Sequence, residues 1–172
     1  MFAAGGSYPA APAPGGGKFL KGNGRMQVDA VMSQPVITIS PQAAITEAAA
    51  LMRRHDIGAL PVVTGGRLVG ILTDRDIVLR VIASPGGDVV AEVGAAMSAD
   101  PATCRAGDDI IGAAVRMSDE QVRRLPVTDP AGRLVGLLSL GDIAENVSEE
   151  LAGQTLGEIC EARRRRHRAF RT

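Results

Sequence analysis

Apolar and polar positions form short blocks along the chain, and the blocks come in the same order twice. In the first copy, apolar residues recur at helical spacing in one segment and at strand-like spacing in three shorter ones. A Gly-Gly pair at 65–66 permits positive φ and predicts a tight hairpin. The predicted elements are a strand at 36–39, a helix at 41–55, strands at 59–63 and 67–72, and a helix from 73 to about 82.

The second copy repeats this order at a nearly constant offset. Met32 aligns with Met97 (97 minus 32, an offset of 65), and after one extra residue near Pro130 Asp76 aligns with Asp142 (142 minus 76, an offset of 66). The repeated order indicates an internal duplication, and a duplication determines the architecture of the whole chain. The second set is a strand at 102–105, a helix at 110–121, strands at 124–128 and 133–138, and a helix from 140 to about 151. A short helix at 89–97 is expected between the copies, and an amphipathic piece at 156–162 after them.

A single hairpin sheet with its helices cannot cover both of its own faces. We therefore predict an α+β fold in which two β-α-β-β-α repeats pack sheet to sheet about a pseudo-twofold axis. The predicted segments are a leader at 1–24, rich in Gly, Ala and Pro and expected to be flexible, a first repeat at 25–84, a linker with a short helix at 85–96, a second repeat at 97–152, and a C-terminal helix with an Arg-rich tail at 153–172.

Composition and charge narrow the class of protein. The chain has no Trp, one Tyr and three Phe, so its core is expected to be aliphatic. Six of the nineteen basic residues lie in 163–172, which leaves thirteen basic against nineteen acidic residues in 1–162, a net charge of −6. An acidic body is not typical of a nucleic-acid-binding domain, although the tail alone could touch an acidic partner. Without a membrane-spanning run or a secretory signal, we expect a cytoplasmic protein. Two cysteines, Cys104 and Cys160, form no disulfide framework or metal motif.

Candidate chemistry lies where each third strand ends. There an apolar run stops at a hydroxyl residue, and an aspartate follows three residues later, as in Thr73 with Asp76 and Ser139 with Asp142. The hydroxyl is a natural helix N-cap, and free amides at a helix start suit an anion. The aspartate could bond a sugar hydroxyl beside a phosphate. A single copy of this hydroxyl–aspartate motif would be explained by helix capping, whereas its occurrence in both repeats favours a ligand site.

Ordered motifs that recur twice make the chain resemble a tandem CBS-domain pair, also called a Bateman module. The pieces that carry the resemblance are His55 to Val62, Gly70 to Ile77, Val122 to Val127 and Gly136 to Ile143. The resemblance covers roughly residues 27–147. Within it, the sequence is similar to small stand-alone CBS-pair proteins of the hypoxic-response type.

The resemblance implies a non-enzymatic regulatory module that binds AMP, ADP, ATP or S-adenosylmethionine between the repeats, with no required cofactor. By the match of motifs, Asp76 and Asp142 would hold ribose hydroxyls, and Thr73 and Ser139 would contact ribose or phosphate. The arginines that could reach phosphates are Arg75, Arg123 and Arg124. The backbone implied for the adenine slots is at Ile37, Thr38, Ile39, Ala59, Leu60 and Pro61 in the first repeat, and at Thr103, Cys104, Arg124, Leu125 and Pro126 in the second.

The two copies differ at one place in the motif. The second has Leu140-Gly141 where the first has Asp74-Arg75, so it lacks the local arginine and the first site is expected to be the stronger. In this reading the ligand changes the angle between the repeats, and a homodimer or an unidentified protein partner senses energy state through it.

Other functions stay open. One is a ligand-independent dimerisation module that uses the helix faces at 45–52 and 110–117, and a third is nucleic-acid contact through the arginine tail. No nucleophile–base pair, metal cluster or GxxxxGK loop is recognisable, so we expect no enzyme and no metal site.

Overall fold

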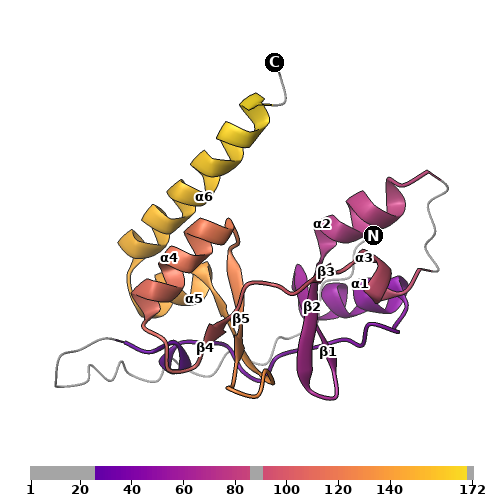
Figure 1. Cartoon of the computed structure of the whole chain (residues 1–172), viewed down its shortest axis with the longest axis horizontal. Helices are drawn as coiled ribbons and strands as arrows, with labels where there is room; N and C mark the ends of the chain where they lie inside the picture. The colour runs from indigo at the N-terminus through magenta and orange to yellow at the C-terminus, as the bar shows by residue number, and fades with distance from the viewer. Residues whose placement is uncertain (1–25, 86–90, 170–172) are drawn as a thin grey trace, which may run out of the picture.

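The computed structural model describes residues 26–85 and 91–169, and of 162–169 it describes the backbone only. The predicted flexible leader lies outside these residues. Two lobes lie side by side, each with a three-stranded sheet on its inner side and helices on its outer side (Figure 1). The prediction of an α+β fold with two repeats is confirmed. None of the helices in the described ranges is both long and apolar enough to cross a bilayer.

The first lobe is built on a hairpin. Strands β1 (Ala59–Thr64) and β2 (Arg67–Thr73) pair antiparallel, and Gly65 and Gly66 make the turn with φ of 58° and 80°, as the sequence predicts. Helix α1 (Ile45–His55) covers the sheet. Its buried residues are Ile45, Ala48 and Met52. Ala49, next to Ala48, is exposed.

The second lobe repeats this plan. Strand β4 (Cys104–Arg105) runs parallel to β5 (Arg124–Thr128), and β5 pairs antiparallel with β6 (Leu134–Ser139). Helix α4 (Ile110–Glu120) buries its apolar face on the sheet. Helix α6 (Glu149–Ala169) packs beside α4 and α5 (Leu140–Asn146).

Each lobe is completed by the segment that leads into the other repeat. Residues 26–33 open the first repeat, yet Val28 is buried in the core of the second, and Ser33 pairs with Leu137 of β6 through two backbone hydrogen bonds of 2.9 and 3.1 Å. Helix α3 (Val93–Ala96) lies in the linker and strand β3 (Ser98–Ala99) opens the second repeat, yet α3 packs in the core of the first and β3 pairs with β2. Neither lobe is therefore contiguous in sequence.

Two glycines make this crossing possible. A Cβ at Gly136 would lie 2.2 Å from Met32 Sδ, and a Cβ at Gly70 would lie 2.5 Å from Met97 Sδ and 3.0 Å from the Ser98 carbonyl oxygen. We call residues 26–33 and 93–99 the crossing segments. The methionine of one crossing segment packs against each glycine. From the sequence alone, a glycine at this point suggests close approach of a ligand; in the structure a methionine fills the space.

Several element boundaries differ from the predictions, and the strand predicted at 102–105 is shortened to Cys104–Arg105. The strand predicted at 36–39 is reduced to a single bridge between Ile39 and Val62, and the helix predicted from Pro41 begins at Ile45. The last two helices also begin and end at residues other than those predicted. The helix predicted from 140 to about 151 ends at Asn146, because Ser148 Oγ accepts the Leu151 amide at 3.2 Å and starts a new helix that runs unbroken through 156–162.

The segment after β2 does form a helix, in two parts. A short α2 (Asp74–Asp76) passes directly into a π-helix, η2 (Ile77–Ile82). Such i→i+5 turns are rare. Ile77 and Val81 are buried, whereas Val78, Leu79 and Ile82 are more than half exposed.

The helix segments expected to mediate dimerisation, 45–52 and 110–117, each turn one apolar face towards a core. In α4 the buried face consists of Ile110, Ala113, Ala114 and Met117. The spacing that predicts an apolar face does not tell whether its own sheet or a second chain covers it. The exposed apolar residues of α4 are Ile111 and Val115.

Candidate functional site

Both repeated corners are capping boxes, as the sequence predicts for their hydroxyl residues. Thr73 Oγ1 accepts the Asp76 amide at 3.1 Å, and Asp76 Oδ2 accepts the Thr73 amide at 2.9 Å. In the second corner Ser139 Oγ accepts the Asp142 amide at 3.2 Å, and Asp142 Oδ2 accepts the Ser139 amide at 2.7 Å. These amides, expected to bind an anion, are therefore already bonded, and the other carboxylate oxygen of each aspartate is the one left to face a ligand.

That second oxygen has a different partner in each corner. Asp142 Oδ1 accepts a hydrogen bond of 3.0 Å from Ser33 Oγ, a neutral hydroxyl on the crossing segment. Asp76 Oδ1 lies 3.3 Å from Nη2 of Arg80, one helical turn further along. The duplicated motif is thus chemically unequal in its two copies.

The second corner opens into a cleft of about 240 Å³ between the repeats. Its apolar wall comes mainly from the first repeat, and the polar corner comes from the second. Asp142 and Arg124 place a carboxylate and a guanidinium at the same cavity. The lining residues are Ser33, Pro35, Val36, Ile37, Asp56, Ile57, Ala59, Arg124, Leu137, Ser139 and Asp142.

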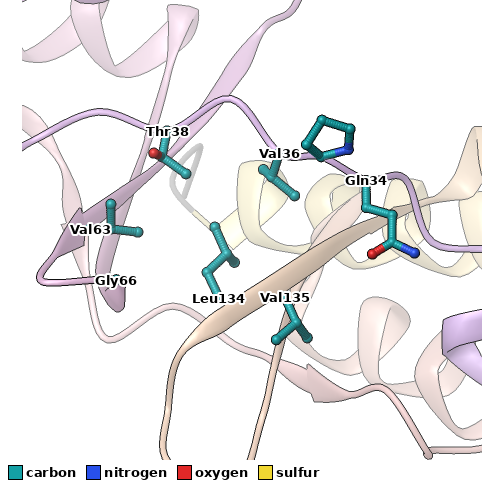
Figure 2. Close-up of a pocket in the computed structure, with 8 residues that line it drawn as sticks. Gln34, Val36, Thr38, Val63, Gly66, Leu134 and Val135 are labelled. Carbon is teal, nitrogen blue, oxygen red and sulfur yellow. The ribbon is translucent and has the colours of Figure 1, made fainter.

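A larger cavity of about 610 Å³ lies beside this cleft and shares Pro35 and Val36 with it. Figure 2 shows Thr38, Val63 and Gly66 on one side of it and Leu134 and Val135 of β6 on the other. Gln34 and Thr38 supply its polar side chains, and none of the described residues that line it is charged. Because recognition of a sugar or phosphate needs convergent polar groups, we place the candidate site in the smaller cleft.

The structure brings together only part of the predicted set. In the cleft, Ile37 and Ala59 of the first repeat face Arg124, Ser139 and Asp142 of the second. Thr38 lines the larger cavity, and Thr73 and Asp76 form the first corner. Arg75 and Arg123 are exposed, and Thr103 is half-buried. Side chains buried in the strands and cores are those of Ile39, Leu60, Pro61, Cys104, Leu125 and Pro126.

Three residues that sequence reasoning did not select contribute to the corners: Ser33, Asp56 and Arg80. Ser33 belongs to the repeated Met-Ser pair, which marked the duplication without revealing a role. Asp56 ends α1 in the left-handed region, with φ of 52°. Arg80 stands four residues after Asp76, a spacing that brings opposite charges together on a helix.

Cys104 behaves as a small apolar residue. It is buried at the start of β4, and burial raises its pKa from 9.0 to about 11, with a further rise from Asp108 opposed by Arg116. Below pH 9 the thiol is protonated in the folded and unfolded chain alike. Above pH 9 the unfolded chain releases a proton that the folded chain keeps, so this group lowers the free energy of unfolding as the pH rises towards 11.

Alkylation should distinguish the two thiols. At pH 8, iodoacetamide is expected to modify the exposed Cys160 while Cys104 stays unmodified, because burial and a raised pKa both withhold the thiolate. Peptide mass spectrometry after brief labelling measures this. Equal labelling of both cysteines in the folded protein would contradict a buried Cys104.

Metal ligands are not grouped in the described ranges. There, no set of three or more His, Cys, Asp or Glu side chains is arranged to hold an ion.

A duplicated α+β unit with crossed leading segments and a cleft between its copies defines a class of tandem paired half-domains. The chain belongs to the CBS-domain family, whose family model matches residues 28–83 and 90–149, more than half of the sequence. This confirms the resemblance to a tandem CBS pair.

Two relatives of known sequence match over most of their length. The CBS domain-containing protein YhcV of Bacillus subtilis is 43% identical over 129 residues, which are 74% of this chain and 91% of YhcV. Hypoxic response protein 1 of Mycobacterium tuberculosis is 36% identical over 144 residues, covering 76% of this chain and 91% of that protein.

Solved structures share the fold. A crystal structure of Hypoxic Response Protein I with two coordinated zinc ions matches with a TM-score of 0.65 at 36% identity, covering 71% of this chain and 99% of that one. The CBS-domain pair of MJ0100, in complex with 5-methylthioadenosine and S-adenosylmethionine, matches with a TM-score of 0.63 at 29% identity, covering 70% and 94%. CBSX2 in complex with AMP gives 0.63 at 25% identity, covering 69% and 94%.

Proposed function

We propose that the protein is a non-enzymatic regulatory module that binds an adenosyl compound in the cleft at the second corner. The observation that carries this proposal is the Asp142 carboxylate, whose Oδ1 faces a cleft that also holds Arg124 and an apolar wall from the other repeat. Support comes from the two structural neighbours that hold AMP or S-adenosylmethionine.

The chemistry of the cleft suits the parts of such a ligand. A ribose hydroxyl can take the place of Ser33 Oγ on Asp142 Oδ1, exchanging one hydroxyl donor for another. The base packs against Val36, Ile37 and Ala59. Arg124, with its guanidinium, is the group of the cleft that can pair with a phosphate.

Size and charge favour a compact ligand. The cleft of about 240 Å³ is below the range of about 300 to 1,000 Å³ typical for drug-sized ligands. Among the described residues that line the cleft, two carry a carboxylate, Asp56 and Asp142, and one carries a guanidinium, Arg124. We therefore expect AMP or the sulfonium compound S-adenosylmethionine to bind more tightly than ADP or ATP, whose added phosphates increase the negative charge.

A ligand in this cleft contacts both repeats and can bias their relative angle. Other links between the repeats lie at the hairpin ends, where Arg67 Nη2 donates to the Ala131 carbonyl at 2.7 Å and the Leu68 amide donates to Gly132 at 3.2 Å. The contacts at the cleft and the hydrogen bonds at these turns therefore both join the sheet of one repeat to the sheet of the other. We expect a homodimer or a protein partner to read the change, in the cytoplasm, as a report of energy or adenosyl-ligand status.

Isothermal titration calorimetry of the full chain with AMP, ATP and S-adenosylmethionine tests the proposal. Saturable binding of AMP or S-adenosylmethionine, with a thermal shift in the same order of ligands, is the expected result. Absence of both heat and thermal shift at millimolar ligand would reject the proposed function.

A second candidate is a ligand-independent dimerisation module. It is favoured by exposed apolar side chains on the helices, namely Val78, Leu79 and Ile82 on η2, Ile111 and Val115 on α4, and Leu156 on α6. Light scattering separates the two functions, because a dimer whose mass and thermal stability do not change with any nucleotide would support the second.

The third candidate, nucleic-acid contact through 163–172, depends on side chains outside the described residues. Steep loss of binding with salt, abolished by deletion of that tail, would support it.

A further inference from the structure

We propose that Arg80 occupies the first corner in place of a ligand, so that the chain binds one adenosyl ligand and not two. This inference rests on the proposed function of the second corner. The duplication would otherwise provide two matching sites, since both corners have the same capping box and the same aspartate.

Arg80 is held at the first corner by three contacts. Its Nη2 lies 3.3 Å from Asp76 Oδ1 and 3.1 Å from Ser98 Oγ, and its Nη1 donates to the Ala96 carbonyl at 2.9 Å. Ala96 and Ser98 lie on the crossing segment that completes the first lobe. The guanidinium thus bridges the corner aspartate and the segment opposite it.

The equivalent positions in the second corner show what Arg80 replaces. Ser98 corresponds to Ser33, and Ser33 donates directly to Asp142 Oδ1 at 3.0 Å. Arg80 corresponds to Asn146 at the offset of 66 (146 minus 80), and Asn146 Nδ2 bonds the Asp142 carbonyl oxygen at 3.0 Å instead of the carboxylate. A direct hydroxyl–carboxylate contact in one corner is therefore a hydroxyl–guanidinium–carboxylate bridge in the other.

The two arrangements present different obstacles to a ribose. At Asp142 the incoming hydroxyl replaces a neutral hydroxyl, which is an exchange of like for like. At Asp76 it would have to displace a guanidinium that is also bonded to Ser98 Oγ and to the Ala96 carbonyl, so three contacts are lost and not one. The Asp76 side chain is 17% exposed and that of Arg80 is 45% exposed, so Arg80 is the outer member of the pair.

Calorimetric stoichiometry with AMP, and in parallel with S-adenosylmethionine, tests the inference. The wild-type chain should bind one ligand per chain. Arg80→Asn, which gives the first corner the residue of the second, should bind two. The double variant Arg80→Asn with Asp142→Ala should retain one, now at the first corner. Arg54→Asn, which removes an exposed arginine of α1, is the matched control and should bind one.

The outcomes separate this inference from the proposed function. Two ligands per wild-type chain, or an Arg80→Asn chain that still binds one or binds none, would overturn the role of Arg80 while the second corner keeps its function. If neither ligand binds to any of these folded chains, the proposed function fails and the inference falls with it. Circular dichroism of each variant establishes that it is folded.

Discussion

Asp142→Ala is expected to lower AMP affinity by about 10- to 100-fold, because hydrogen bonds to a charged group contribute about 1.5–3 kcal/mol each. The variant removes Oδ1, the oxygen that faces the cleft, together with Oδ2, which accepts the Ser139 amide at 2.7 Å. Loss of the capping contact should also lower the free energy of unfolding by about 1 kcal/mol. Calorimetry measures the affinity, and chemical denaturation measures the stability.

Asp76→Ala is the matched control for this variant. It breaks the same capping box in the first repeat, where Asp76 Oδ2 accepts the Thr73 amide at 2.9 Å. A similar loss of stability is expected, with AMP affinity unchanged, because Arg80 and not a ligand faces the carboxylate there. Equal loss of affinity in both variants would show that the corners are equivalent. A loss confined to Asp76→Ala would place the site in the first corner, as the sequence favoured.

Val28→Asp should unfold the lobe that is distant from it in sequence. Val28 is fully buried in the core formed with β5, β6 and α4. An unpaired charge there is expected to cost more than about 4 kcal/mol, a large share of the stability of a domain. Hydrogen exchange should therefore show lost protection in β5 and β6 while β1 and β2 are affected less.

Val93→Asp is the counterpart, and its effect should be reversed. Val93 aligns with Val28 at the offset of 65 (93 minus 28) and is fully buried in the core of the first lobe. Protection should be lost in β1 and β2. Val78→Asp, on the exposed side of η2, should leave both lobes protected, because that side chain is 51% exposed. If Val28→Asp instead destabilised β1 and β2, the crossed packing of the lobes would be wrong.

Local chemistry explains why many elements could be predicted. The Gly65-Gly66 turn, the Thr73 and Ser139 caps and strand β5 depend on neighbours within a few residues. The start of α6 was harder to predict, because Ser148 caps a new helix inside a run that has continuous helical spacing. A cap is recognised in the sequence only where the helical pattern also stops.

The sequence predicted which residues belong to the candidate site, but it did not predict how the two repeats bring them together. The aspartates, Ile37, Ala59 and Arg124 were selected, and each was assigned to a slot within its own copy. In the structure, Ile37 and Ala59 of one copy face Asp142 of the other. Arg75 was chosen as an arginine that could reach a phosphate at the first corner, whereas Arg80, which was not chosen, lies 3.3 Å from Asp76 Oδ1.

The sequence by itself determined the duplication, the hairpin of each copy, helices α1 and α4, and the two capping corners, because each depends on spacing or on contacts between residues close in sequence. Tertiary structure alone decided which lobe each leading segment completes, and therefore which oxygen of each aspartate meets Ser33 or Arg80. Periodicity specifies which side chains share a face and leaves open which sheet will cover that face. In this protein each leading segment packs on the sheet of the other repeat, and the two corners differ because Arg80 lies where the second copy has Asn146.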